Sequence, residues 1–583
     1  MKTAKRFLTA ALAVLFTLMC ALPVLADETP AAPQTYTLAI TNPAAGHTYE
    51  VYQIFEGYNT QENGKEYLSD IEWGSGIKTD NGSLNAMIVE LKKASLYDEH
   101  TTYVAGVNDA TKVAMALSKL KDKAEEVDKF NEIVGAYLNT AIDTKQANGT
   151  APIQFTLPAG YYLVKDKNDS VGENESYTKY LVKLVADATM NIKSQSMSLS
   201  KYILNGTDNQ KVLANNAAMG DTVHYCLESK LSEMDGYDTY TFIVHDELDA
   251  GLTFKNDVAV KIGATDYAGK TVEYATKENG PYGSTLPEIE KDKKLYIRIT
   301  LNGLTQQYNG QLVSITYSAT VNEKANIGNT PNTNAAYLEY SNNPNKSQQG
   351  EQTSTTVTPK TTVSTYVAGI QISKVSPKGS LLPGAQFKIE AQVGTDAIKE
   401  LNVTGYSFAK AENDSDKSYY YPEGDSFVTV APNGSDQKYV AKGGTNRNTG
   451  SSIVGMTGDD KNSTQLGILR FDGLKAGTYT ITEVLAPTGY KKLEKPITVK
   501  ITWVENSNDG NHWSYEVTGG TKGDIALGEV KDGVQSFKIV NQHGLTLPFT
   551  GGAGANLLAG VGLALMAAAA AAILYIKHRK DRE

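Results

Sequence analysis

The sequence predicts a mainly β protein with several domains in tandem. Tyrosine and glycine are abundant, at 34 and 51 of 583 residues, and Asn-Gly, Asp-Gly and Gly-Gly pairs recur along the chain. Such a composition is typical of short strands joined by tight turns. Apolar and polar residues alternate singly in four segments, which we expect to be half-buried strands: 36–40, 295–299, 313–317 and 479–484.

One segment, 110–143, departs from this β pattern. Its apolar residues recur three or four positions apart, or at sums of those steps: Val113, Leu117, Leu120, Val127, Phe130, Val134 and Tyr137. This spacing predicts an amphipathic helix, or two, packed on the sheet of the first domain.

Both ends of the chain indicate export. Residues 1–26 have a basic start, an apolar run and a small residue at Ala26, which predicts a cleaved signal peptide. Near the other end, an apolar run predicts a transmembrane helix at 555–576, and the basic residues at 577–583 predict a cytoplasmic tail.

Two polar stretches, 187–198 and 341–362, read as boundaries between domains. We therefore expect an N-terminal domain at 27–190, a middle domain at 191–360 and a C-terminal domain at 361–545. The region between the two ends is long enough for each domain to have its own core.

Composition argues against several classes of function. The net charge of −10, with no basic stretch in the mature part, argues against a nucleic-acid partner. The seven histidines are scattered and Cys226 is the only cysteine outside the signal peptide, so we expect no metal, no cofactor and no disulfide. No catalytic constellation of an enzyme is visible.

The segment Leu547-Pro548-Phe549-Thr550-Gly551, placed just before the apolar run, resembles the LPXTG cell-wall sorting signal of Gram-positive surface proteins. The resemblance implies that a sortase cysteine attacks the Thr550 carbonyl, releases the chain from Gly551 onward, and passes Thr550 to an amine. The amine that accepts decides between wall anchoring and polymerisation.

The C-terminal domain is similar to the Cna B-type domains of pilins, in segments 369–375, 382–387, 477–490 and 537–541. The resemblance implies an immunoglobulin-like β-sandwich with an isopeptide bond between Lys374 and Asn541, promoted by Glu483. In an apolar core both charged forms are disfavoured, so Lys374 can lose its proton and attack the amide while a protonated Glu483 polarises it. The competing interpretation is an ordinary surface pair.

The middle domain is similar to the Cna A-type, or fimbrial isopeptide, domain in segments 198–202, 220–225, 242–254 and 334–342. The resemblance assigns the amine to Lys201 and the acid to Asp246. The acceptor amide is Asn334, with Asn342 as the alternative.

The N-terminal domain resembles that of shaft pilins in segments 46–55 and 157–166, but its first strand has no lysine and Asp166 stands where the acid would be. We expect no isopeptide bond there. In shaft pilins a linkage lysine lies between the first and second domains, and Lys193 has that place, although Asn-Ile precedes it where Tyr-Pro is usual. Lys183 is a weaker competitor.

These features together favour a backbone pilin on a Gram-positive cell surface, with Thr550 joined to Lys193 of the next subunit. The expected partners are a pilus-specific sortase, the housekeeping sortase, identical subunits, tip and base pilins, and peptidoglycan through the polymer. The alternative is a monomeric LPXTG-anchored adhesin. The sequence identifies no host ligand.

Overall fold

The computed structural model describes residues 34–580, apart from 63, 99–107, 120–123, 150, 173–174, 192–196, 233, 235–236, 238, 344–354, 412–417, 435, 460–464, 506–510, 522 and 545–552. Its contacts divide the chain into two compact units. The first is Met1–Asn215, Asp221–Asn326 and Pro331–Thr365, and the second is Asn216–Gly220, Ile327–Thr330 and Tyr366–Glu583. The first unit holds the N-terminal and middle domains, and the second holds the C-terminal domain.

The N-terminal domain contains two sheets among its described residues. In the first strand, β1, buried residues alternate with more exposed ones, as the sequence predicts for 36–40. One sheet has the order β5-β1-β8, with β1 (Thr35–Thr41), β5 (Ile153–Pro158) and β8 (Ala188–Asn191). The other has the order β3-β2-β6-β7 with β4 beside β2, from β2 (Thr48–Glu62), β3 (Lys65–Trp73), β4 (Asp143–Gln146), β6 (Gly160–Asp166) and β7 (Lys179–Leu184). Because β8 lies within 187–198, this predicted linker begins with a strand.

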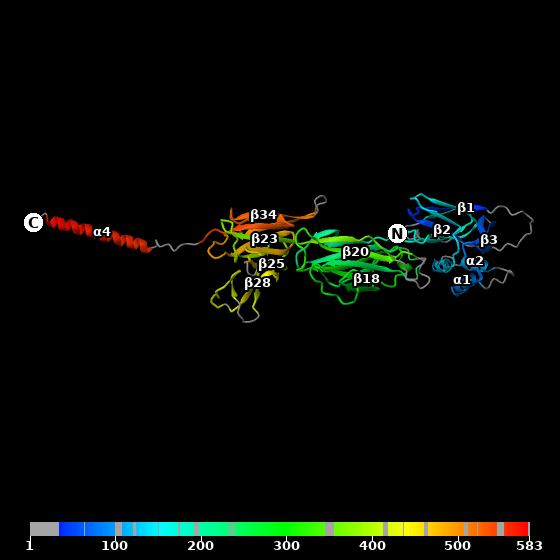
Figure 1. Cartoon of the computed structure of the whole chain (residues 1–583), viewed down its shortest axis with the longest axis horizontal. Coiled ribbons are helices and arrows are strands. Elements are labelled where there is room, and N and C mark those ends of the chain that lie inside the picture. Colours follow the sequence, from blue (N-terminus) through cyan, green and yellow to red (C-terminus); the bar gives the residue numbers. More distant parts are fainter. Residues whose placement is uncertain are drawn as a thin grey trace, which may run out of the picture. The chain divides into compact units, whose positions relative to one another are not determined.

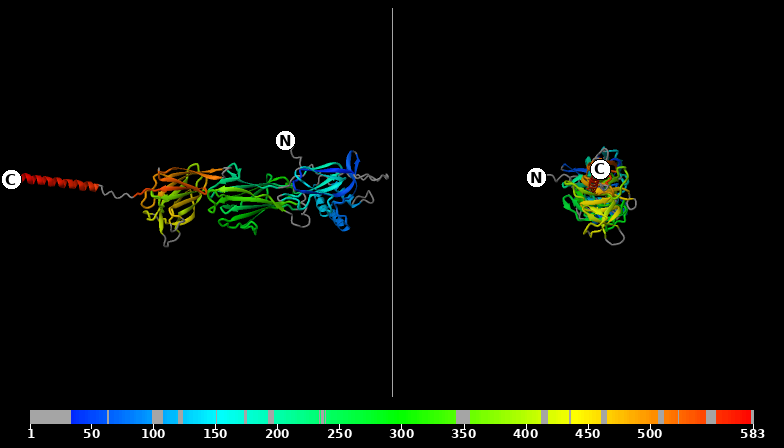
Figure 2. Two further views of the ribbon diagram at one scale, coloured as in Figure 1. Left: turned by 45° about the horizontal axis from the view of Figure 1, so that its top comes forward. Right: turned by 90° about the vertical axis from the view of Figure 1, so that its left-hand side faces the viewer.

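The described part of this domain includes the helices α1 (Asn81–Lys93), α2 (Asp109–Ser118) and α3 (Ala124–Ala136). Figure 1 and Figure 2 show α1 and α2 on one side of β2 and β3. Phe130 of α3 contacts Phe55 of β2, with ring centroids 6.1 Å apart, and both rings are buried. The predicted helical segment is therefore confirmed as two helices on the sheet. The additional helix α1, capped by Asp80, was not predicted.

The middle domain is a β-sandwich of two sheets. The first has the order β10-β9-β12-β19-β15-β16 with β14 beside β19, from β9 (Ser200–Asn205), β10 (Gln210–Val212), β12 (Thr222–Lys230), β14 (Leu252–Phe254), β15 (Ala259–Ile262), β16 (Thr265–Asp266) and β19 (Leu312–Val321). The second has the order β11-β22-β20-β13-β18-β17 with β21 beside β20, from β11 (Ala214–Asn216), β13 (Phe242–Asp249), β17 (Lys270–Ala275), β18 (Lys294–Leu301), β20 (Asn332–Ser341), β21 (Thr355–Val357) and β22 (Thr361–Tyr366). A short 3-10 helix, η1 (Gln306–Tyr308), precedes β19.

One boundary from the sequence needs correction. The strand β22 pairs with β20 of the middle domain, whereas the sequence predicts that 361–366 belongs to the C-terminal domain. The polar stretch 341–362, which predicts the boundary, overlaps the start of this alternating Thr-Thr-Val-Ser-Thr-Tyr strand.

The C-terminal domain is built on one continuous network of 13 paired strands, whose main path is β33-β32-β31-β24-β29-β25-β30-β23-β35-β34. Its strands are β23 (Ala368–Val375), β24 (Gln386–Ala391), β25 (Glu400–Lys410), β26 (Tyr419–Glu423), β27 (Ser426–Val428), β28 (Tyr439–Thr449), β29 (Ser452–Met456), β30 (Ile468–Leu474), β31 (Gly477–Leu485), β32 (Ile497–Val504), β33 (His512–Gly519), β34 (Ile525–Lys531) and β35 (Val534–Val540). The first strand, β23, lies parallel to the last, β35. This pairing brings two ends of the domain's sequence side by side.

The helix α4 (Ala553–Lys580) covers the segment of the predicted transmembrane helix. Within the described residues, no helix meets the length and apolarity that a membrane crossing requires. The predicted signal peptide, 1–26, lies outside the described residues.

Candidate cross-linking triads

The first candidate site, the middle triad, consists of Lys201, Asp246 and Asn334. Lys201 comes from β9 in one sheet of the sandwich, whereas Asp246 and Asn334 come from β13 and β20 in the other. Each occupies an inward position of its strand, and the exposed fractions are 1%, 3% and 0%. The alternation of the strands therefore directs three polar side chains into the core between the sheets.

A tyrosine hydroxyl connects the middle triad. The Nζ of Lys201 lies 2.6 Å from Oδ2 of Asp246 and 2.8 Å from the hydroxyl of Tyr317. That hydroxyl lies 2.7 Å from the same Asp246 oxygen and accepts a hydrogen bond of 2.7 Å from Nδ2 of Asn334. The alternative acceptor, Asn342, lies elsewhere, where its Nδ2 donates to the Glu175 carbonyl at 3.3 Å.

Burial shifts the middle triad toward its neutral forms. Removal from water lowers the pKa of Lys201 below its ordinary value, against the opposing charge of Asp246. Removal from water also raises the pKa of Asp246, against the opposing effect of Lys201. A neutral amine is a nucleophile, and a neutral carboxylic acid can donate a proton.

The second candidate site, the C-terminal triad, consists of Lys374, Glu483 and Asn541. The parallel register aligns Val375 of β23 with Val540 of β35, and the Asn541 amide nitrogen donates to the Val375 carbonyl at 3.1 Å. This register places Asn541 beside Lys374. All three side chains are buried, with exposed fractions of 2% or less.

In the C-terminal triad the acid contacts both partners directly. Oε1 of Glu483 lies 3.3 Å from Nζ of Lys374 and accepts a hydrogen bond of 2.8 Å from Nδ2 of Asn541. Lys374 donates to Oδ1 of Asn541. The Leu493 amide holds the other carboxylate oxygen at 2.8 Å. Burial lowers the pKa of Lys374 to about 8, which makes the neutral amine accessible near physiological pH.

The N-terminal domain has a buried acid in a comparable place but a different partner. Oδ1 of Asp166 lies 2.9 Å from Nδ1 of His47, and Oδ2 accepts hydrogen bonds of 2.6 Å from both the amide and the hydroxyl of Thr178. The second ring nitrogen of His47 lies 3.0 Å from Glu175. An imidazole and a threonine thus occupy both oxygens of this acid.

Other predicted site residues are not tested by the geometry. Lys193 and the sorting segment Leu547, Pro548, Thr550 and Gly551 lie outside the described residues. The competitor Lys183 is half-buried in β7, where its Nζ donates to the Glu66 carbonyl at 3.2 Å.

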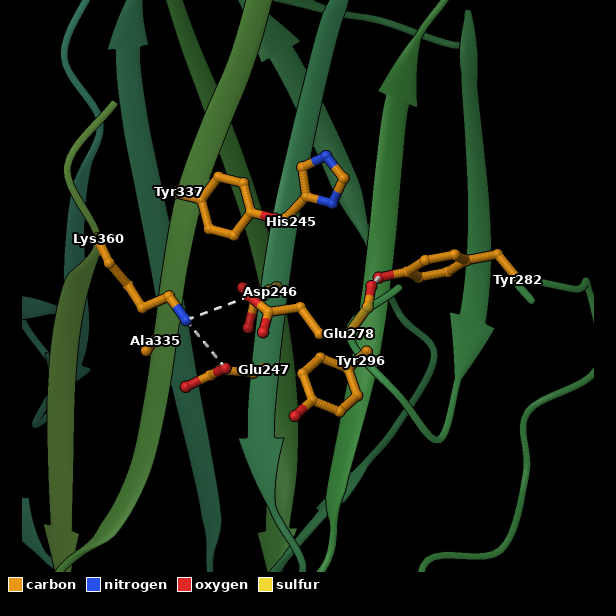
Figure 3. Close-up of a pocket in the computed structure, with 9 residues that line it drawn as sticks. All are labelled: His245, Asp246, Glu247, Glu278, Tyr282, Tyr296, Ala335, Tyr337 and Lys360. Carbon is orange, nitrogen blue, oxygen red and sulfur yellow. Dashed lines mark hydrogen bonds and ion pairs between the residues drawn. The ribbon is translucent and has the colours of Figure 1, made fainter. Parts of the chain in front are cut away.

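A small pocket on the second sheet of the middle domain is a weaker candidate. Figure 3 shows Lys360 extending toward two glutamates, and its Nζ lies 3.1 Å from Glu247 and 3.6 Å from Glu278. Nearby, His245 pairs with Glu339 at 2.8 Å. Because these charged groups already pair with one another, the pocket has few polar groups left to bind a ligand.

Sequence reasoning missed Tyr317. The predicted strand 313–317 contains it, and its buried face also carries Val313 and Ile315. The available signal was a tyrosine in register with core residues, because a buried tyrosine hydroxyl usually has a polar partner.

Comparison with known proteins gives one family match. Residues 368–513 match the SpaA prealbumin-like fold domain, so this segment carries a domain of that kind. The match contains Lys374 and Glu483, whereas Asn541 lies beyond it.

A curated relative is the trypsin-resistant surface T6 protein of Streptococcus pyogenes serotype M6, 26% identical over 329 residues. The alignment covers 54% of this chain and 53% of the relative, so the chain spans about half the length of the curated relative it matches.

Three solved structures to which the chain is similar are of pilins. The T6 backbone pilin of S. pyogenes serotype M6 is 15% identical with a TM-score of 0.47, covering 89% of this chain and 100% of that one. The major pilin SpaA of Corynebacterium diphtheriae is 16% identical with a TM-score of 0.38, covering 87% and 100%. BcpA, the major pilin of Bacillus cereus, is 13% identical with a TM-score of 0.37, covering 88% and 100%.

Proposed function

We propose that this chain is the backbone subunit of a covalent, sortase-assembled pilus on a Gram-positive cell surface. The observation that carries the proposal is the pair of buried triads, one in the middle domain and one in the C-terminal domain. The SpaA-type domain at 368–513 and the similarity to a trypsin-resistant surface protein support the same function.

Each triad forms an intramolecular isopeptide bond, between Lys201 and Asn334 and between Lys374 and Asn541. In each case the neutral lysine Nζ attacks the asparagine Cγ, the bond from Cγ to Nδ2 breaks, and ammonia leaves. The lysine nitrogen had two protons, of which one stays on the new amide and the other leaves with the ammonia. The acids Asp246 and Glu483 carry that proton.

The geometry gives these bonds a mechanical purpose. In the C-terminal domain the bond joins the first and last strands, which already lie parallel and adjacent. Tension applied at the two ends of the domain then passes through the covalent link rather than through the hydrogen bonds of the sheet. A shaft subunit needs such a path because each subunit transmits the whole load on the fibre.

The polymer forms when a sortase transfers Thr550 of one subunit to Lys193 of the next. The sequence supports this joint through the LPXTG segment and through the position of Lys193 between the first two domains. A pilus-specific sortase builds the polymer with tip and base pilins, and the housekeeping sortase attaches it to peptidoglycan. Export of the precursor, and its retention in the membrane by the apolar segment at 555–576, stay predictions from the sequence.

The decisive test is a surface extract from cells that carry the wild-type chain or the Lys193→Ala variant, with Lys183→Ala as the matched control. We expect a ladder of high-mass species for the wild type and for Lys183→Ala, and its loss in Lys193→Ala. A ladder that persists in Lys193→Ala would move the joint to another lysine. A wild type without any ladder would favour the monomeric LPXTG adhesin.

The internal bonds are tested separately by the intact mass of the purified chain. Two bonds predict a mass lower than the sequence mass by two ammonia molecules, and a mass equal to the sequence mass would contradict both. Peptide mapping then assigns each cross-link to its pair of residues.

A further inference from the structure

We propose that Tyr317 is a catalytic residue of the middle triad and that its hydroxyl passes a proton from Asp246 to the leaving nitrogen of Asn334. The inference rests on the isopeptide bond proposed above and adds a fourth participant to it. Its basis is the position of one hydroxyl that contacts the amine, the acid and the amide.

The hydroxyl of Tyr317 takes part in three hydrogen bonds. It accepts from Nδ2 of Asn334 and from Nζ of Lys201, and a phenol oxygen can accept two such bonds. Its single proton therefore points to the remaining partner, Oδ2 of Asp246, 2.7 Å away. The bonds form a continuous path from the lysine nitrogen through the acid and the phenol to the leaving nitrogen.

Packing fixes the hydroxyl in this place. The Tyr317 side chain is 3% exposed, and its ring lies 5.2 Å from that of Tyr225 and 5.5 Å from that of Phe254. Nζ of Lys201 lies over the Tyr317 ring, 5.2 Å from its centroid. The reacting groups are thus held together before any bond forms, as efficient proton transfer requires.

The proton path balances without another reagent. Neutral Lys201 attacks Cγ of Asn334 through Nζ, and Nδ2 of Asn334 thereby becomes an amine nitrogen that can accept a proton. The Tyr317 hydroxyl turns from Asp246 to Nδ2 and gives it a proton, while neutral Asp246 gives its own proton to the Tyr317 oxygen. The surplus proton on Nζ then passes to Oδ2 of Asp246. The bond from Cγ to Nδ2 then breaks, ammonia leaves, and Tyr317 and Asp246 return to their starting forms.

Aspartate needs this intermediary, whereas glutamate does not. In the C-terminal triad, Oε1 of Glu483 itself contacts the leaving nitrogen at 2.8 Å. In the middle triad the leaving nitrogen contacts the Tyr317 hydroxyl instead, at 2.7 Å. The other carboxylate oxygen of Asp246 has no hydrogen-bond partner among the described residues, so the route through Oδ2 and Tyr317 is the one that the contacts provide.

The acidity of the phenol agrees with a concerted transfer. Burial, together with the neighbouring Asp246, raises the pKa of Tyr317 well above its ordinary value. The hydroxyl therefore keeps a proton at every stage, giving one only as it receives another.

The test is the rate of bond formation in Tyr317→Phe. The full-length chain is synthesised cell-free and stopped at increasing times, and the peptide joining Lys201 to Asn334 is measured against the one joining Lys374 to Asn541. We expect the middle bond to form about 100-fold more slowly, the scale of a lost general acid, and the C-terminal bond to form at the wild-type rate. Tyr340→Phe, which removes another buried tyrosine hydroxyl from the same domain, should leave both rates unchanged.

Each outcome decides between the two proposals. A wild-type chain with neither cross-linked peptide refutes the isopeptide bonds themselves. A wild-type chain with both, and a Tyr317→Phe chain that forms the middle bond at the wild-type rate, overturns only the role of Tyr317. Equal slowing by Tyr340→Phe would also overturn it, because a general loss of packing would then explain the effect.

A second substitution covers the case in which Tyr317→Phe does not fold. Replacing Tyr317 with 3-fluorotyrosine keeps the ring and the hydroxyl but makes the hydroxyl a stronger acid. A relay through this hydroxyl predicts a changed rate of middle-bond formation, because proton transfer to the oxygen and from it both depend on its acidity. An unchanged rate would overturn the proposal.

Discussion

The middle and C-terminal domains each place a lysine, a carboxylic acid and an asparagine in the core but connect them differently. In the C-terminal triad the glutamate contacts both the amine and the leaving nitrogen. In the middle triad the aspartate, shorter by one methylene, contacts the amine, and the Tyr317 hydroxyl lies between it and the leaving nitrogen. For the isopeptide bonds proposed above, the comparison favours a continuous proton path as the required element, which either a longer acid or an intervening tyrosine hydroxyl can complete.

The largest effect should follow from replacing each acid by the amide of the same length, in the variants Glu483→Gln and Asp246→Asn. Each variant should lose the bond of its own domain and keep the other, because each triad is separately buried. The C-terminal bond connects residues 167 positions apart, so its loss should destabilise that domain by about 5 kcal/mol through the freed chain entropy of the unfolded state. Intact mass reports the bond, and pulse proteolysis in denaturant reports the stability.

Each acid variant serves as the experimental control for the other. If Asp246→Asn also removed the bond between Lys374 and Asn541, the two reactions would not be independent. The comparison of two self-sufficient sites would then be wrong.

A shorter acid in the C-terminal triad should have the next largest effect. Glu483→Asp withdraws the carboxylate from Asn541, and no tyrosine hydroxyl contacts that amide in the described structure. We expect the C-terminal bond to form about 100-fold more slowly, since general acid catalysis is lost, in the same cell-free time course. The exposed Glu494→Asp is the matched control. Formation at the wild-type rate would show that acid length does not separate the two sites.

The effect of pH on the rate of forming the bond between Lys374 and Asn541 should be smaller but measurable. Because burial lowers the pKa of Lys374 to about 8, the fraction of Lys374 in the neutral, nucleophilic form decreases below that pH. The rate of bond formation should fall about tenfold for each pH unit below 8 and level off above it. Time courses between pH 6 and 9 give this profile. A flat profile would mean that the lysine proton is already transferred before the slow step.

The sequence predicted most of the triads because their residues lie in short, recognisable segments. Lys374, Glu483 and Asn541 come together in the structure, as do Lys201, Asp246 and Asn334. Tyr317 escaped prediction because it is 116 positions from Lys201 and lies in an ordinary alternating strand. Only the packing of two sheets reveals which inward residues meet.

In the fold, too, the sequence predicts some elements and not others. Alternation predicted strands such as β18 and β19 because one face of each is buried. The sequence placed β22 in the wrong domain, because sheet membership depends on pairing with β20 and not on the distance to a polar stretch. The helix α1 was missed because a start at Asn81-Gly82-Ser83 reads as a turn, and its core contacts come from Met87, Ile88 and Leu91 further on.

The smallest expected effect concerns the N-terminal domain, where the titratable imidazole of His47 contacts the buried acid Asp166. Burial opposes the charge on His47, but its hydrogen bonds to Asp166 and Glu175 prevail and raise its pKa above the ordinary 6.5. A raised folded-state pKa means that the stabilisation is fully present below pH 6.5 and is lost as pH rises through the folded-state pKa. We expect the melting temperature of this domain to fall by about 2–4 °C across that window, which corresponds to about 1 kcal/mol. The protection factors of the β2 and β6 amides, measured by hydrogen exchange of the full chain and corrected for the intrinsic pH dependence of exchange, isolate this domain, and His47→Gln should remove their pH dependence. If the protection factors stayed equally pH-dependent in His47→Gln, the imidazole would not be the responsive group, and the contrast between the proposed covalent pairs and a titratable pair would fail at this domain.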